Sequence, residues 1–219
     1  MLERGFEIID GFISEIELGL LNNGLSQHKF ISGVGGIRNI DKKCLAVNGF
    51  CLSEKMMNKA SKYLSGKASL VRAIIFNKTE EQNWLVSWHQ DKTVAVSTKF
   101  EKEGWGPWSI KDGVYHVQPP LEVLNQMVCF RIHLDASNLD NGCLKVIPDS
   151  HLLGIIKQEK IGETLKSEEQ VDCEVSKGAV LIMRPHLLHS SAKAKIPSQR
   201  RVLHLEYTSY QLPHGTTWL

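Results

Sequence analysis

Three histidines in the sequence are followed two positions later by a carboxylate; the pairs are His89/Asp91, His133/Asp135 and His204/Glu206. Alternate residues of a strand project to the same face, so each pair could direct an imidazole and a carboxylate at one metal ion. A mononuclear non-haem iron(II) centre uses two histidines and one carboxylate and keeps its other positions open. With 9 histidines and 24 acidic residues among 219, such pairs also arise by chance. A pair alone therefore identifies no site.

The second histidine of such a centre must come from a strand that the fold brings beside the first. The stretch "MRPHLLHSS" supplies His186 and His189 directly after the predicted strand "GAVLIM". If His89 is the first ligand along the chain, the predicted strands between it and His189 cover residues 93–98, 126–134, 143–147 and 171–175. This is about the number of strands after which the chain of a double-sheet jelly roll comes back beside its first strand. Too few strands follow His133, and the third pair comes after the other histidines. The order along the chain favours the first pair.

Arg200 and Arg201 stand at the start of the last predicted strand, "RRVLHLEYTSY". A guanidinium there could bind a dicarboxylic acid through two parallel hydrogen bonds. Neighbouring strand residues point to opposite faces, so only one of the two arginines would face the site.

The elements that must position these residues are mainly β-strands, preceded by helices. Ser14 is a predicted N-cap of a first helix with Ile16, Leu20 and Leu21 on one face. A second helix is predicted from the cap Ser53 to a stop at Gly66. Short β-branched runs separated by turn residues follow. We expect one domain over residues 1–219, with a mixed α/β part at 1–66 and a β-rich core at 67–212 that the strand pattern predicts to be a sandwich or a jelly roll.

The segment at 99–120 interrupts this rhythm, being long and rich in glycine, proline and aromatic residues. Long connections in compact domains are often functional. We expect a lid that hinges at Gly104 and Gly106 and contacts the substrate through Trp105, Trp108 and Gln118. The alternative is a loop that packs on itself.

The predicted strand "CFRIHLD" carries Arg131 and His133 on the face opposite Phe130 and Ile132. Either this polar face lines the interior of the site or it is a solvated sheet face. In the first case, Arg131 and His133 contact the substrate, and the positive charge of Arg131 predicts a small or medium substrate with an anionic group.

Composition excludes several classes of function. The net charge of +2 indicates no nucleic-acid surface, and no apolar run approaches the ~18 residues of a membrane span. The five cysteines show no C-x-x-C spacing and predict reduced thiols. The charged N-terminus predicts no signal peptide. We therefore expect a cytoplasmic protein with a small-molecule partner.

Four motifs in this order resemble the phytanoyl-CoA dioxygenase family of iron(II)/2-oxoglutarate oxygenases. They are "WHQD" at 88–91, "LDNGCLKVIPDSH" at 139–151, "MRPHLLHSS" and "RRVLHLEY". The resemblance covers residues from about 70 to 210 and implies a double-stranded β-helix, which is a cupin-like jelly roll. The sequence departs from the family at Asp149, where glycine is usual, and at Arg131, where some relatives have tryptophan.

The resemblance also implies the roles of individual residues. Iron(II) would be bound by His89, Asp91 and His189. The arginine that binds the distal carboxylate of 2-oxoglutarate falls eleven residues after the second histidine, which gives Arg200, and Ser191 would be a further contact. The implied reaction consumes dioxygen and 2-oxoglutarate, releases succinate and carbon dioxide, and hydroxylates a substrate that the sequence does not identify.

Two other functions stay open at this point. One is a cupin-like metal- or ligand-binding protein without oxygenase activity, although such a protein has no need of an anion-binding arginine. The other is halogenation, which requires a vacant carboxylate position for chloride. Asp91 fills that position, so hydroxylation is favoured.

Overall fold

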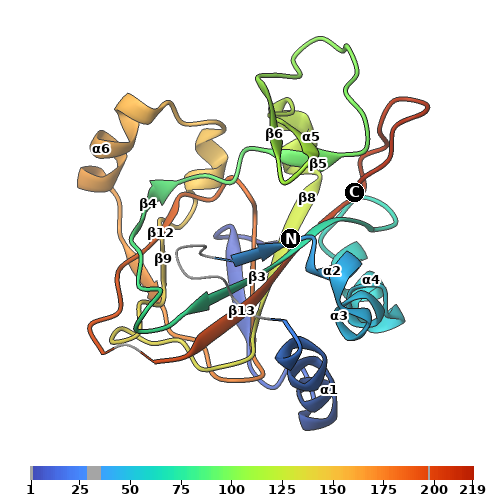
Figure 1. The fold of residues 1–219 in the computed structure, drawn as a ribbon. Coiled ribbons are helices and arrows are strands. Elements are labelled where there is room, and N and C mark those ends of the chain that lie inside the picture. The colour runs from blue at the N-terminus through green and yellow to red at the C-terminus, as the bar shows by residue number, and fades with distance from the viewer. Residues whose placement is uncertain (1, 29–35, 197) are drawn as a thin grey trace.

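The computed structural model describes residues 2–28, 36–196 and 198–219, and its largest element is an antiparallel sheet (Figure 1). The six strands of this sheet are, in spatial order, β1 (Phe6–Ile9), β11 (Val180–Met183), β8 (Met127–His133), β13 (Arg200–Thr208), β3 (Ser69–Lys78) and β2 (Gly36–Arg38). The first and last of these come from the N-terminal part of the chain. Both parts of the sequence therefore build the same sheet.

A second antiparallel sheet contains β10 (Val171–Cys173), β9 (Leu144–Val146), β12 (His189–Ser191) and β4 (Val86–His89). An apolar cluster joins the two sheets, with Cys129, Leu181 and Met183 from the larger one and Leu144 and Val146 from the smaller. The predicted jelly roll is thus confirmed.

The strands of the large sheet alternate strictly between two environments. On β8, Phe130 and Ile132 belong to the outer apolar cluster, whereas Arg131 is buried on the inner face. On β13, Leu203 and Leu205 point outward in the same way. Because side chains alternate along a strand, this arrangement leaves a row of polar residues facing the second sheet. The polar face predicted from the sequence is therefore interior and not solvated.

Helices cover the outer face of the large sheet. They are α1 (Glu15–Ser26), α2 (Ile40–Lys43), α3 (Leu45–Cys51) and α4 (Glu54–Ser61). Ser14 and Ser53 cap α1 and α4 as predicted. The predicted apolar face of α1 is correct for Leu21, which is buried, and wrong for Ile16 and Leu20, which are 77% and 61% exposed. The buried stripe consists of Leu18, Leu21 and Leu25, whose spacing of three and four follows the helical period.

The segment at 99–120 is not the long loop expected from the sequence. It contains β6 (Trp108–Lys111) and β7 (Val114–Val117), which form a hairpin and join β5 (Val94–Val96) in a third sheet. The hairpin turns at Asp112 and Gly113, both with positive φ. Asp-Gly is a favoured pair for such a turn because both positions require a left-handed backbone.

The remaining helices are α5 (Leu121–Asn125), α6 (Gln158–Ser167) and a 3-10 turn at Ser150–Leu153. None of these was predicted. All five cysteines are buried free thiols, as expected. No helix in the described part of the chain is long and apolar enough to cross a membrane.

Candidate active site

Strand pairing brings two of the predicted metal ligands together. His89 ends β4 and His189 begins β12, and the two residues are direct partners across the antiparallel pair. Their ring centroids lie 4.3 Å apart. The fold thus places side by side two histidines that are 100 positions apart in the sequence.

Both imidazoles are held by the backbone of their own strand. His89 Nδ1 lies 2.8 Å from the carbonyl oxygen of Ser87, and His189 Nδ1 lies 2.8 Å from that of Leu187. A carbonyl oxygen can only accept, so Nδ1 carries the proton in each ring and Nε2 presents its lone pair. This is the tautomer that a metal-binding histidine requires. Burial lowers the pKa of His189 to about 4, which keeps this ring neutral at pH 7.

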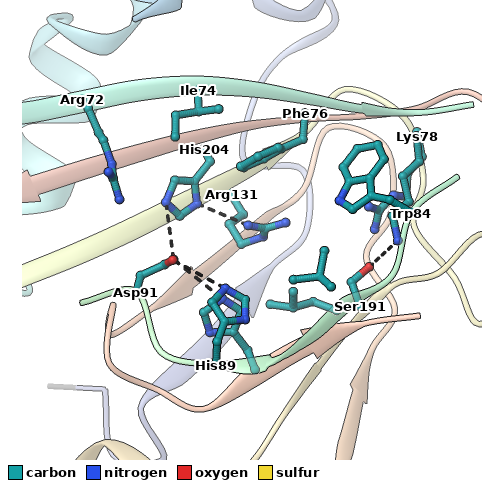
Figure 2. A pocket seen from close by; sticks show the side chains of 14 residues that line it. Arg72, Ile74, Phe76, Lys78, Trp84, His89, Asp91, Arg131, Ser191 and His204 are labelled. Carbon is teal, nitrogen blue, oxygen red and sulfur yellow. Dashed lines mark hydrogen bonds and ion pairs between the residues drawn. The ribbon is translucent and has the colours of Figure 1, made fainter. Parts of the chain in front are cut away.

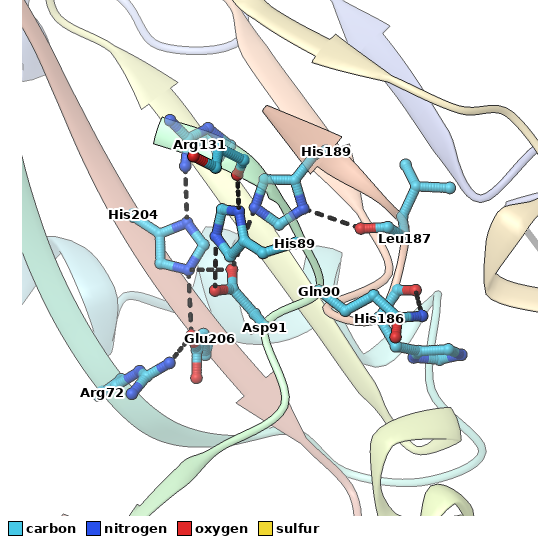
Figure 3. Close-up of polar contacts among 11 residues, drawn as sticks. Arg72, His89, Gln90, Asp91, Arg131, His186, Leu187, His189, His204 and Glu206 are labelled. Carbon is cyan, nitrogen blue, oxygen red and sulfur yellow. Dashed lines mark hydrogen bonds and ion pairs between the residues drawn. The ribbon is translucent and has the colours of Figure 1, made fainter. Parts of the chain in front are cut away.

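Asp91 completes the group (Figure 3). Its carboxylate oxygens lie 3.7 Å from His89 Nε2 and 3.6 Å from His189 Nε2. Burial opposes its ionisation, but electrostatic interaction with His189, His204, His89 and Arg72 holds the pKa of the carboxyl below its ordinary value. The three side chains offer one ligand atom each within 4.8 Å of one another. Two imidazoles and one carboxylate with this spacing suit a divalent iron ion.

Gln90, the residue between the candidate ligands His89 at the end of β4 and Asp91 just after it, anchors the turn. Gln90 points away from Asp91 and donates to the carbonyl oxygens of Gly154 and His186, while it accepts from the backbone N–H of Ile156. The Asp91 backbone N–H donates to Pro185. These bonds tie the ligand strand to the segment that leads into β12. His186 itself is buried beside His151 and does not line the cavity.

A second polar group adjoins the first. His204 accepts from Arg131 at Nδ1 (3.3 Å) and donates from Nε2 to Glu206 (3.1 Å). Glu206 is also paired with Arg72 at 2.7 Å. The atoms of Cys129, His204 and Glu206 lie close enough to bind a metal ion, but both nitrogens of the imidazole and the Oε1 atom of the carboxylate are already engaged by these partners. This network meets the candidate metal site at Asp91, whose carboxylate oxygen lies 4.0 Å from His204 Nε2.

The candidate ligands open into a cavity of about 250 Å³ between the sheets (Figure 2). Three buried cations, Lys78, Arg131 and Arg200, line this cavity. No carboxylate among the described residues forms an ion pair with any of them; the ion pairs of this region involve Arg72 and Arg201 instead. Buried cations without a counter-ion are costly, so this end of the cavity suits an anion.

Ser191 connects the cations to the second sheet. Lys78 Nζ lies 2.8 Å from Ser191 Oγ, which in turn donates to the carbonyl oxygen of Gly142. Arg200 donates to the same carbonyl at 2.6 Å. Gly142 has a positive φ of 75°, and a Cβ there would lie 2.4 Å from the Ala192 carbonyl oxygen. Only glycine fits this position, which explains the "DNG" turn in physical terms.

Arg201 lies on the other face of β13. Its Nε and terminal nitrogen both donate to Asp135, each at 2.8 Å. The ion pair ties the start of β13 to the end of β8. Of the two arginines in the sequence motif, Arg200 therefore lines the cavity and Arg201 stabilises the fold.

The residues predicted to contact the substrate are only partly brought together. Arg131 lines the cavity, whereas His133 is buried beside it, donates to the Arg131 carbonyl and is not part of the lining. Trp105 and Trp108 pack against Phe100 in a separate apolar cluster.

Gln118 binds the backbone of the same turn, at Gly106 and Pro107. Like the two tryptophans, it lies outside the lining of the cavity. The contact of these three residues with substrate stays a prediction that the geometry of the described residues does not favour.

Asp149, which replaces the usual glycine of the family, has a φ of 62°. It is the residue before the 3-10 turn. Aspartate tolerates this left-handed conformation better than most residues. The departure is thus a local change of turn.

The chain was compared with known families, curated proteins and solved structures. The model of the phytanoyl-CoA dioxygenase family matches residues 1–202. The chain belongs to the phytanoyl-CoA dioxygenase family. Members of this family use iron(II), 2-oxoglutarate and dioxygen, and the donor set and the anion-binding cavity fit those groups. No curated protein is similar enough in sequence to match.

Solved structures share the fold at low identity. AviO1 from Streptomyces viridochromogenes Tue57 has a TM-score of 0.71 at 17% identity over 97% of this chain and 93% of that chain. HygX from Streptomyces hygroscopicus, solved with nickel and 2-oxoglutarate, has 0.67 at 13% over 94% and 83%. The alpha-ketoglutarate-dependent epimerase SnoN from nogalamycin biosynthesis has 0.68 at 13% over 99% and 81%. Because the sequence identities are this low, the similarity to these structures establishes the fold alone.

Proposed function

We propose that this protein is a dioxygenase that hydroxylates a small or medium organic substrate with iron(II), 2-oxoglutarate and dioxygen. One substrate C–H bond becomes C–OH, and 2-oxoglutarate is converted to succinate and carbon dioxide. One observation carries the proposal: two histidines and a carboxylate share a cavity with three buried cations that have no carboxylate partner in the described residues.

His89, Asp91 and His189 would bind the metal through Nε2, a carboxylate oxygen and Nε2. The backbone bonds at Nδ1 keep both rings oriented and in the required tautomer. When bound, iron(II) would activate dioxygen, the four-electron oxidant, with two electrons supplied by the oxidative decarboxylation of 2-oxoglutarate and two by the substrate C–H bond.

Arg200 and Ser191 would hold the distal carboxylate of 2-oxoglutarate. The structure adds Lys78 to this pair, since its ammonium contacts Ser191. Charge-assisted hydrogen bonds to a carboxylate are among the strongest that side chains form. Ile74, Phe76 and Trp84 form apolar walls of the cavity and would keep water from the reacting atoms.

The test is anaerobic binding followed by turnover. Iron(II) with 2-oxoglutarate should give a weak visible absorption, and 2-oxopentanoate, which lacks the distal carboxylate, should give it only at much higher concentration. Air should then release succinate, faster when a substrate from a metabolite screen is present. If iron binds but 2-oxoglutarate gives neither absorption nor succinate, the alternative of a cupin-like binding protein is favoured.

Product mass separates hydroxylation from other outcomes. A hydroxylated product gains one oxygen atom, and the oxygen derives from dioxygen. The same cofactors serve an epimerase in SnoN, and an epimerised product has the mass of its substrate. Halogenation is disfavoured here because Asp91 provides the carboxylate ligand.

A further inference from the structure

A second cavity of about 320 Å³ adjoins the first. The two share the walls formed by Arg72, Ile74, Phe76, Trp84 and Asp91. Arg200 and Ser191 line only the first cavity, whereas Arg38, Thr93 and Lys111 line only the second. The candidate metal ligand Asp91 thus stands between an end suited to 2-oxoglutarate and a second end with its own cations.

The cations of the second cavity come from two elements that meet at its rim. Arg38 ends the edge strand β2, and Lys111 ends β6 at the hairpin turn. Arg38 donates to Asp112 at 3.2 Å, which holds the hairpin turn against the edge of the large sheet. The hairpin therefore borders the cavity with its tip, although the tryptophans at its base do not reach it.

The positive charges at this rim are not fully compensated. Arg72 is neutralised by Glu206, and Arg38 is paired with Asp112. Lys111 forms no ion pair among the residues that the structure describes; the pairs found near it belong to Arg38 and Arg72. Burial and the nearby guanidinium groups of Arg72 and Arg38 lower the pKa of Lys111. Lys111 is thus a cation without an ion-pair partner in the described residues, and it stands beside Arg38 at the rim, where an anionic ligand would be attracted.

The wall that the two cavities share has an apolar part, whose Trp84 also lies against the ammonium of Lys78, 5.4 Å from the ring centroid. Phe76 and Trp84 line both cavities, and Ile74 lies beside them. A ligand that spans this space would place an apolar body against two aromatic rings and an anionic end between Arg38 and Lys111. Its other end would lie beside Asp91.

We propose that the second cavity binds the organic substrate through a carboxylate or phosphate group held by Arg38 and Lys111, with an apolar segment between Phe76 and Trp84. The assignment rests on the proposed function, since it takes Asp91 as a metal ligand and the Arg200 end as the cosubstrate site. It replaces the sequence-based expectation that Arg131 holds the anionic group, because Arg131 lines the first cavity and not the second.

The experiment is anaerobic titration calorimetry on the full chain loaded with iron(II). The first titration measures 2-oxoglutarate binding and so tests the proposed function separately. Hexyl phosphate, hexanoate and hexylammonium are then titrated into the iron-loaded protein both without 2-oxoglutarate and with 2-oxoglutarate at saturating concentration. We expect at least one of the two anions to bind and the ammonium not to bind. The tighter anion identifies the substrate group as phosphate or carboxylate.

Matched variants locate the bound anion. Arg38→Gln and Lys111→Gln should each weaken binding of the anion about tenfold, as loss of a charge-assisted hydrogen bond does. Asp112→Asn removes the same ion pair as Arg38→Gln but frees the guanidinium, so binding should be kept or strengthened. Lys99→Gln, a charge change in the segment before β6, is the control and should have no effect.

Several results would overturn the assignment. The assignment fails if neither anion binds or if hexylammonium binds as tightly as the anions. It also fails if Arg38→Gln and Lys111→Gln leave the affinity for the anion unchanged. Finally, it fails if the anion no longer binds when 2-oxoglutarate is present. The last result would place the anion at Arg200. Weaker binding in both Arg38→Gln and Asp112→Asn would show that the ion pair merely supports the hairpin. If 2-oxoglutarate does not bind but the variants behave as expected, the proposed function fails and the anion site stands.

Discussion

At the scale of single residues, the choice among three His-x-acid pairs can be tested directly. His89→Ala, Asp91→Ala and His189→Ala should each abolish iron(II) binding and succinate release, because each removes one of three ligand atoms that lie within 4.8 Å of one another. His133→Ala should leave iron affinity nearly unchanged, since its ring donates to the Arg131 carbonyl. Equilibrium dialysis with iron(II) measures both. Loss of iron in His133→Ala with retention in His89→Ala would reject this ligand set.

The two adjacent arginines should separate cosubstrate binding from stability. Arg200→Ala should raise the KM for 2-oxoglutarate about 10- to 100-fold, because it removes a charge-assisted contact to the carboxylate. Arg201→Ala should leave this KM unchanged and lower the free energy of unfolding by about 1 kcal/mol, since its half-buried partner is Asp135. Steady-state kinetics and urea unfolding measure the two effects. A larger KM effect at position 201 would contradict the assignment of faces on β13.

Lys78 should couple cosubstrate binding to pH. Burial and the charges of Arg200 and Arg131 lower its pKa to about 7 in the free protein. A bound carboxylate favours the ammonium form, so its binding raises this pKa. Affinity for 2-oxoglutarate should therefore be greatest below pH 7 and fall as the pH rises through 7 to 9.

Calorimetry at pH 8 in buffers of different ionisation enthalpy should show proton uptake on 2-oxoglutarate binding. Lys78→Met should abolish this uptake, whereas Lys99→Met should not. Uptake that persists without Lys78 would assign the proton to another group.

The candidate ligands and Arg200 are accessible to sequence reasoning because their spacing matches a family motif, although Asp91 lies just beyond the end of β4. Lys78 and Arg72 were missed, although strand alternation runs through "SLVRAIIFNK" and places both on the face of Ile74 and Phe76. Arg38 could not have been found in this way. Its role depends on a three-residue edge strand and on the distant hairpin that it contacts, and no local pattern encodes that contact.

At the scale of elements, the hairpin shows how a signal was overlooked. The Asp-Gly turn between two β-rich stretches indicates a hairpin, but the glycine- and proline-rich sequence before it dominated the interpretation. α6 was missed for a related reason, because "QEKIGETLKS" buries only Ile161 and contains a glycine. Elements that bury little apolar surface carry a weak periodic signal.

The tryptophans at the base of this hairpin should act on stability. Trp105 is 8% exposed and packs against Phe100 and Tyr210. Trp105→Ala should cost about 3 kcal/mol, or roughly 6–12 °C in Tm. Ile110→Ala is the control on the hairpin, since Ile110 is 65% exposed. Calorimetric melting checks both, and 2-oxoglutarate turnover per folded molecule should be unchanged. Loss of substrate-coupled turnover at an unchanged Tm would instead restore the expectation of a lid.

At the scale of the whole molecule, the fold closes the site by bringing together strands from distant parts of the chain. β4 and β12 meet in the small sheet, and β3, β8 and β13 supply the facing cations. The number and order of predicted strands indicate a sandwich or a jelly roll, and the family resemblance implies the jelly roll, the arrangement that returns β12 beside β4. The stretch "GFEIIDGF" predicts the short strand β1 but not its place in this core, and the three residues of β2 give little pattern.

Because the site joins both sheets, its ligands should stabilise the whole fold in a fixed order. A ligand that binds only the folded state raises the free energy of unfolding by RT ln(1 + [L]/Kd). Anaerobic iron(II) should raise the Tm, and 2-oxoglutarate should raise it further, but with little effect when iron is absent, since the metal and Arg200 then no longer act together. In Arg200→Ala, iron(II) should still raise the Tm, but 2-oxoglutarate should raise it no further. In Asp91→Ala, neither ligand should raise the Tm. Val180→Ala, which trims the outer core, should lower the starting Tm and keep both increments. Equal stabilisation by 2-oxoglutarate with and without iron would show that the cosubstrate does not bind through the metal.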